Sequence, residues 1–230
     1  AVGMLLAMIV TLLSKGLSYP LIIVGLAMGG AVGFVAAKRV QMTGMPELVA
    51  LFNGFGGLAS LLVGLAEYYR AKMSNNLLES VLIVELNSFT ATVIVLAILI
   101  GGITFTGSIY AWGKLSGKLG GRALTFTGQK AFNALLALGI IAAGILFSSS
   151  PATELAHAVL ITVLILSLLL GIFAVMPIGG GDMPVVISLL NSCSGLAACA
   201  AGFVINNNVL VVAGCLVGAS GLILTVIMCK

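Results

Sequence analysis

Two asparagines, Asn53 and Asn191, occupy equivalent positions in a segment that occurs twice in this sequence. Residues 45–59 and 183–197 share a Met-Pro start, a leucine before the asparagine and a Gly-Leu-Ala after it, all in register. Each asparagine follows its proline by about two helical turns, which places it about 10 Å along a helix that begins at the proline. We therefore expect the two carboxamides to lie at the same depth.

If these helices span a membrane, carboxamides at that depth lie among lipid chains, which offer no hydrogen-bond partner. Ser188, Ser192 and Ser194 accompany one asparagine, and Ser60 with Gly57 accompanies the other. Two interpretations stay open: the polar side chains bond neighbouring helices together, or they line a path for protons. An amide does not take up a proton near neutral pH, so along such a path it would orient water or a titratable neighbour.

The titratable side chains lie near the ends of the apolar runs or between them. His157 is about one turn into an apolar run, and Glu85 begins another near the outer face. Asp182, between three glycines and Pro184, either caps the helix that follows or gates its inner mouth. A proton relay normally has an ionisable group within the bundle. We therefore expect the proton carrier to be an ionisable group on a partner helix, packed against both asparagine-bearing helices.

Other kinds of chemistry have little support in this sequence. The string GFGGLA at residues 54–59 loosely matches a dinucleotide fingerprint, but no strand precedes it. The four cysteines lie in apolar runs, without a C-x-x-C pair or partner histidines, which favours packing over metal ligation. No Ser-His-Asp arrangement is apparent. We expect no catalytic residue, metal or cofactor in this chain.

The composition identifies the solvent in which these helices fold. Of 230 residues, 61% are hydrophobic and 7% are charged, and the mean hydropathy is +1.29. Soluble domains have about 25% charged residues, so this composition excludes a soluble globular domain. The ten basic residues are scattered, which argues against nucleic acid as a partner. A polytopic membrane protein remains.

The apolar runs predict an all-α bundle of about eight transmembrane spans. Their bounds are 2–13, 20–37, 46–66, 86–111, 130–147, 154–175, 184–205 and 209–229. The first is too short to cross about 30 Å of hydrocarbon, so we expect an incomplete helix there. The third and seventh spans begin on the same side, which makes the repeat parallel. Seven basic residues lie on that side and three on the other, which predicts a cytoplasmic C-terminus.

Several blocks of the sequence resemble the membrane domain of the proton-translocating nicotinamide nucleotide transhydrogenase beta subunit. They are GGGDMPVVISLLNSCSGLAA at 179–198, ITFTGS at 103–108 with GKL at 113–115, VGASG at 217–221 with IMCK at 227–230, and MTGMPELVA at 42–50. The resemblance implies a Re/Si-specific enzyme that couples hydride transfer from NADH to NADP⁺ to inward proton movement. Residues 1–230 would be its proton-conducting domain, with an NADP-binding domain following residue 230.

The resemblance also implies roles for individual residues. Many family members have a histidine in the third span where this sequence has Asn53, and members without it have the histidine on a small alpha-type membrane subunit. This departure implies a multi-subunit enzyme of a bacterial inner membrane, a homodimer of the whole complex, with NAD(H) and NADP(H) bound by soluble domains. Ser220 and Thr225 would join the asparagines and Ser60 along the proton path, while Asp182 and Glu85 would gate or couple it.

Two other functions remain open at this stage. A stand-alone ion-coupled secondary transporter could be built on a parallel repeat of spans. Such a transporter would move a solute when reconstituted alone. A purely structural membrane anchor would use its polar residues only for packing, and would tolerate the loss of both asparagines.

Overall fold

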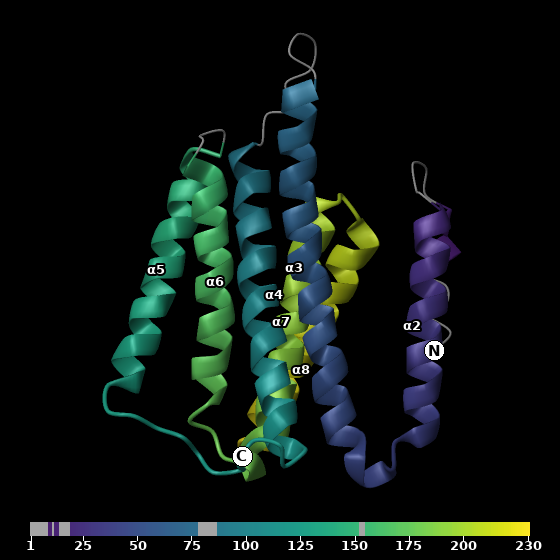
Figure 1. Ribbon diagram of the computed structural model, residues 1–230, viewed down its shortest axis with the longest axis vertical. Helices are drawn as coiled ribbons and strands as arrows, with labels where there is room; N and C mark the ends of the chain where they lie inside the picture. The colour runs from purple at the N-terminus through teal and green to yellow at the C-terminus, as the bar shows by residue number, and fades with distance from the viewer. Residues whose placement is uncertain (1–8, 11, 14–18, 78–86, 152–154) are drawn as a thin grey trace. The chain divides into compact units, whose positions relative to one another are not determined.

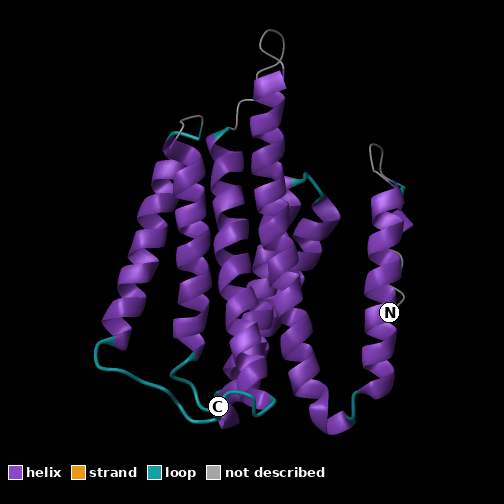
Figure 2. Cartoon of the chain, in the orientation of Figure 1, coloured by secondary structure: helices purple, strands orange, loops and turns teal. Residues whose placement is uncertain are grey.

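The computed structural model describes residues 9–10, 12–13, 19–77, 87–151 and 155–230, and every long element in these ranges is an α-helix. The helices are α2 (Tyr19–Arg39), α3 (Met45–Leu77), α4 (Ser88–Leu115), α5 (Gln129–Ser149), α6 (Leu155–Val175), α7 (Met183–Val204) and α8 (Asn208–Met228). Two short 3₁₀ turns, η1 (Met42–Gly44) and η2 (Gly180–Asp182), precede α3 and α7. Figure 2 shows this helical content along the drawn chain.

Seven helices in the described ranges are long and apolar enough to cross a membrane, which confirms the predicted all-α polytopic class. The expected first span, 2–13, lies mostly outside the described residues; of it, residues 9, 10 and 12 are helical. The chain divides into two compact units, residues 1–45 and residues 46–230. In the first unit α2 buries none of its residues and ends on Lys38 and Arg39.

In the second unit α4 is the central helix, in contact with α5, α6 and α7, while α7 packs on α8 (Figure 1). Leu61, Ile98, Ile140 and Leu160 come from four different helices and form one apolar core. Helix α3 runs antiparallel to α4, because Gly54 near its start lies against Ser108 and Gly64 lies against Ile94.

Helix α7 also starts at the carboxyl end of α4, where η2 contacts α4. Farther along α7, Leu190 lies against Gly107 of α4. Helices α3 and α7 therefore run in the same direction, as expected for a parallel repeat.

Equivalent glycines of the repeat bring helix backbones into direct contact. A methyl group added at Gly57 would lie 2.8 Å from the carbonyl oxygen of Gly101, so α3 meets α4 there without intervening side chains. A methyl group at Gly195 would lie 2.8 Å from the carbonyl oxygen of Gly214, so α7 meets α8 in the same way. Small residues at such crossings are the usual device for close helix packing in membranes. The repeated unit thus has the same packing role in both copies.

Two predicted helix ends were wrong, and for related reasons. Helix α3 continues past Ala66 to Leu77, because Tyr68 is buried and Glu67 pairs with Arg70 at 3.4 Å within the same turn. Helix α4 continues past Ala111 to Leu115, because the side chain of Lys114 is buried in the bundle. A charged residue ends an apolar run without ending a helix. The expected starts of the fourth and sixth spans, 86 and 154, lie outside the described residues.

Candidate functional site: a groove between α3, α7 and α8

Asn53 is buried against α4 and bonded to it. Its carboxamide nitrogen donates to the hydroxyl oxygen of Ser108 over 2.9 Å, and both side chains are buried. Ser108 lies within one of the family-like blocks, but sequence reasoning gave it no role. Its pairing with Asn53 joins two helices, and no spacing along one helix reveals such a contact.

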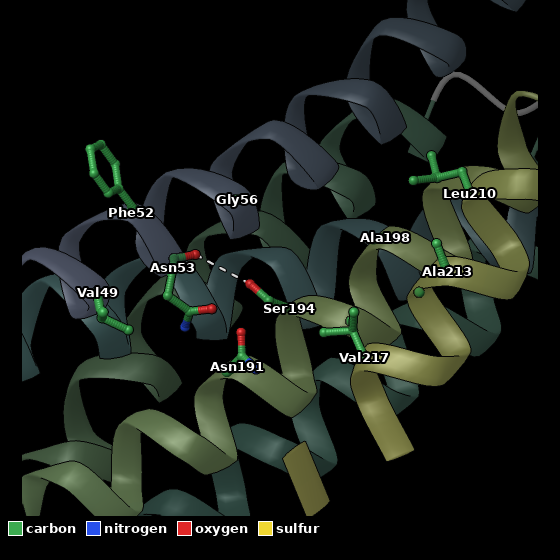
Figure 3. Close-up of a pocket in the computed structure, with 12 residues that line it drawn as sticks. Val49, Phe52, Asn53, Gly56, Asn191, Ser194, Ala198, Leu210, Ala213 and Val217 are labelled. Carbon is green, nitrogen blue, oxygen red and sulfur yellow. Dashed lines mark hydrogen bonds between the residues drawn. The ribbon is translucent and has the colours of Figure 1, made fainter. Parts of the chain in front are cut away.

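A second bond joins α3 to α7. The hydroxyl of Ser194 donates to the backbone carbonyl oxygen of Asn53 over 3.2 Å (Figure 3). Both polar groups of Asn53, its side chain and its backbone carbonyl, therefore bind a neighbouring helix.

Asn191 shares a groove of about 530 Å³ with Asn53, so the structure brings together two asparagines whose predicted common feature was their depth. Their side chains extend into the same space between α3 and α7 (Figure 3). The carboxamide of Asn191 is half-buried and makes no hydrogen bond to any described part of the chain. The remaining lining residues are Val49, Phe52, Gly56, Ser194, Gly195, Ala198, Leu210, Ala213, Gly214 and Val217. The groove is thus mostly apolar, and the amide of Asn191 is available in it for a hydrogen bond.

Two predicted serines of α7 face α8. Ser188 donates to the carbonyl oxygen of Gly221 over 3.3 Å, and Ser192 donates to that of Gly218 over 2.6 Å. Ser60 is buried on α3, where its hydroxyl donates to the carbonyl oxygen of Gly56 over 3.3 Å. None of the three lines the groove. These contacts have the form of interhelical and intrahelical hydrogen bonding.

Ser220 and Thr225 lie toward the carboxyl end of α8. Ser220 is exposed and donates to the carbonyl oxygen of Val217 over 3.0 Å. Thr225 donates to the carbonyl oxygen of Gly221 over 2.8 Å. The structure does not place either residue in the groove with the asparagines.

Asp182 precedes α7 at the N-cap position, but its carboxylate makes no capping hydrogen bond. The residue is exposed, and its backbone amide donates to the carbonyl oxygen of Gly179 over 3.2 Å. The carboxylate is therefore accessible from outside the bundle at the start of the helix that carries Asn191. Glu85, the other residue expected to gate or couple, lies outside the described residues.

Lys114 is a buried cation that sequence reasoning assigned to a loop. It lies in the last turn of α4 with 3% of its surface exposed. Its ammonium donates to the carbonyl oxygens of Met176 over 2.6 Å and Ile178 over 2.7 Å. These carbonyls follow the end of α6, where the helix dipole favours a positive charge. Lys114 therefore fixes the connection that leads into Gly179 and α7.

His157 lies on α6 near the end remote from Lys114. Its Nε2 is 2.9 Å from the hydroxyl oxygen of Tyr69, and its ring stacks near Tyr68 at 6.4 Å between centroids. The histidine therefore has an aromatic environment and a hydrogen-bond partner of its own. Among the described residues, no three His, Cys, Asp or Glu side chains form a group suited to a metal ion.

Comparison with known proteins places this geometry in context. A family model described as NAD(P) transhydrogenase beta subunit matches residues 1–230. The NAD(P) transhydrogenase subunit beta of Rhodospirillum rubrum is 41% identical over 234 residues, which cover 100% of this chain and 48% of the relative. A second sequence of that name, from a specified strain of the species, has the same identity and coverage. The chain thus spans about half the length of the curated relatives it matches.

Proposed function

This chain belongs to the NAD(P) transhydrogenase beta-subunit family, and from that membership we propose that it conducts protons for a transhydrogenase complex. In this proposal, residues 1–230 form the membrane domain, and hydride transfer from NADH to NADP⁺ is coupled to inward proton movement. NAD(H) and NADP(H) bind to soluble domains, one of which follows residue 230. The complex lies in a bacterial inner membrane with the C-terminus of α8 in the cytoplasm.

The observation that supports proton conduction is the amide of Asn191, which bonds no described part of the chain and shares a groove with Asn53. In a purely packing role, an intramembrane asparagine would be expected to bond a neighbouring helix, as Asn53 does with Ser108. Asn191 instead offers its carboxamide to the groove. Because an amide does not titrate near neutral pH, the group that takes up the proton comes from elsewhere.

We assign that group to a histidine on a helix of a small alpha-type subunit. The groove has a volume of about 530 Å³, and most of its lining residues are apolar. Phe52 and Val217 supply apolar surface on either side. A helix seated there would place an imidazole beside the amide of Asn191, which could orient water or the ring itself. Ser60, Ser220 and Thr225 would then serve the path beyond the groove.

Asp182 would couple this path to the nucleotide domain. It begins the helix that carries Asn191, and about 13 Å of that helix separates the two residues. A soluble domain docked on the exposed carboxylate could shift the start of α7 and so change the position of the amide. Glu85 would serve a similar gating role at the opposite face. The complete enzyme would be a dimer of such complexes.

Reconstitution tests the proposal against its alternatives. Vesicles should contain this chain alone, or the chain with its alpha-type subunits and NADP-binding domain, with a pH dye inside. We expect proton entry only in the complete complex and only when nucleotides turn over. Rapid proton or solute movement by the isolated chain would contradict the proposal and support a transporter. Full coupling in a variant without both asparagines would support an anchor.

A further inference from the structure

Helices α4 and α6 lie side by side in the bundle (Figure 1). A second groove lies between them, beside the carboxyl end of α4. It has a volume of about 380 Å³, and its walls include Phe105, Ile109 and Trp112 of α4 and Ile172 of α6. It shares no lining residue with the asparagine groove. About 15 Å of helix separates Phe105 from the end of α4, so the groove extends from that end of the span toward the membrane interior.

The connection that follows α4 borders this groove near the carboxyl end of α4. Gly117 adopts a left-handed conformation with φ 71°, which reverses the chain. The amide of Leu119 then donates to the carbonyl oxygen of Gly113 over 2.8 Å. This turn places the ammonium of Lys118 4.3 Å from the centroid of the Trp112 ring. The result is an apolar groove with a cation and an indole at its rim.

Among the described residues Lys118 forms no ion pair, and the sequence around it is basic. Residues 86–153 contain no Asp or Glu, whereas Lys114, Lys118, Arg122 and Lys130 all fall in this stretch. Lys114 is buried against carbonyl groups, and the side chain of Lys118 is exposed. Tryptophan and basic side chains are enriched where a membrane meets water, and basic ones attract anionic lipids.

We propose that this groove binds an anionic phospholipid, with one acyl chain along α4 and α6 and the phosphate at Lys118. The apolar walls match a hydrocarbon chain, and the exposed ammonium of Lys118 matches the headgroup. A free phosphate would gain nothing from Phe105, Ile109 or Ile172. A lipid without net charge would gain little from Lys118. A single basic residue near the surface raises affinity for an anionic lipid about fivefold, and a lipid without net charge lacks this attraction.

The test uses the assembled complex and a phosphatidylglycerol probe with a diazirine in its acyl chain. Cross-linked peptides are identified by mass spectrometry, so the readout needs neither hydride nor proton transfer and stands apart from the proposed function. We expect labelling on peptides that contain Ile109 or Ile172. Competition by unlabelled phosphatidylglycerol should be at least fivefold more effective than by phosphatidylcholine with the same chains, and inorganic phosphate should not compete.

Variants test the contribution of the Lys118 charge separately from that of the apolar walls of the groove. Lys118→Gln should raise the concentration of phosphatidylglycerol needed for half-maximal labelling about fivefold. Lys38→Gln is the matched control, since Lys38 also lies over a ring, 4.5 Å from the centroid of Phe34, but on α2. Ile172→Trp, or Ile109→Phe if the first does not assemble, should reduce labelling by filling the groove. Equal competition by the two lipids, equal effects of the two lysine variants, or labelling confined to other helices would overturn the proposal.

Discussion

The carboxamide nitrogen of Asn53 and the hydroxyl of Ser108 lie 2.9 Å apart across the contact between α3 and α4. About one turn farther along α3, the backbones of Gly57 and Gly101 touch. The hydrogen bond and the backbone contact together fix the rotation of α3, and therefore the face that Asn53 presents to α7. The first prediction concerns this pair.

Ser108→Ala removes the acceptor of a buried amide, and we expect it to lower the free energy of unfolding by about 1 kcal/mol. It should also slow coupled proton transfer, because the Asn53 side chain loses its fixed position. Thermal unfolding in detergent and dye-based proton uptake measure the two effects. Thr92→Ala is the control, because the Thr92 hydroxyl donates only to Ser88 one turn back in α4. If both variants behave alike, the Asn53–Ser108 bond has no role beyond local structure.

Asn191→Leu should lower coupled proton transfer by at least tenfold while the complex still assembles, since the amide bonds no described part of the chain. Asn53→His should partly restore proton uptake in a complex whose alpha-type subunit lacks its own histidine, whereas Asn53→Gln should not. Thr162→Ala, an exposed α6 hydroxyl that bonds only Ala158, serves as the control for assembly. Wild-type proton uptake by Asn191→Leu would remove the groove from the proton path.

Asp182→Asn should weaken the link between nucleotide exchange and proton flow more than it weakens folding, because the carboxylate caps nothing. The ratio of protons moved to NADPH formed measures this link, and a thermal-shift assay measures folding. Glu47→Gln is the matched control, since Glu47 lies in the first turn of α3, the repeat counterpart of α7. Equal loss of coupling in both variants would indicate a general effect of charge at this face.

Lys114→Met should destabilise the complex by about 2 kcal/mol or more, since two partly buried carbonyls lose a charged donor. Lys114→Arg should recover part of this loss by keeping a cation at the end of α6. Lys130→Gln, at an exposed position, should leave the unfolding midpoint unchanged. The measurement is thermal unfolding of the purified complex, and an unchanged midpoint for Lys114→Met would mean that water satisfies both carbonyls.

The basic residues of the connection after α4 predict that it faces the cytoplasm. In a variant whose four cysteines are replaced, a single cysteine at position 122 should resist a membrane-impermeant maleimide in intact cells. It should react after the membrane is permeabilised. Labelling of intact cells would reverse the proposed topology, including the position of the C-terminus.

Composition and apolar runs predicted the class of fold because lipid restricts a chain to few solutions, and each helix here satisfies its own backbone. Helix ends were less accessible to prediction. The runs stop at the first charged residues, whereas α3 continues through Glu67 and Arg70, and α4 through Lys114. Beyond the apolar layer, side-chain contacts decide where a helix ends.

For the site, the sequence predicted only the features that follow from the position of a residue along one helix and from the repeat of that helix. Register in the repeat placed Asn53 and Asn191 at the same depth, and the structure brings them into one groove. The register of the repeat could not reveal that Ser188 and Ser192 bond α8 while Ser194 bonds α3. These three serines, within two helical turns, bond two different neighbouring helices, because about 100° of rotation separates successive residues. The partners are decided by packing between helices.

The glycine contacts also limit how this domain can move. Helices whose backbones touch, as at Gly57 with Gly101 and at Gly195 with Gly214, have no compressible layer between them. Neither partner can turn about its own axis without steric overlap. Each pair, α3 with α4 and α7 with α8, therefore moves as one rigid unit. Relative displacement of the two pairs then falls where α7 meets α3 and α4, at the 3.2 Å bond from Ser194 to the carbonyl of Asn53 and at the contact of Leu190 with Gly107. A switch at this boundary would break the Ser194 bond and shift Leu190 on α4, while both glycine contacts remain intact.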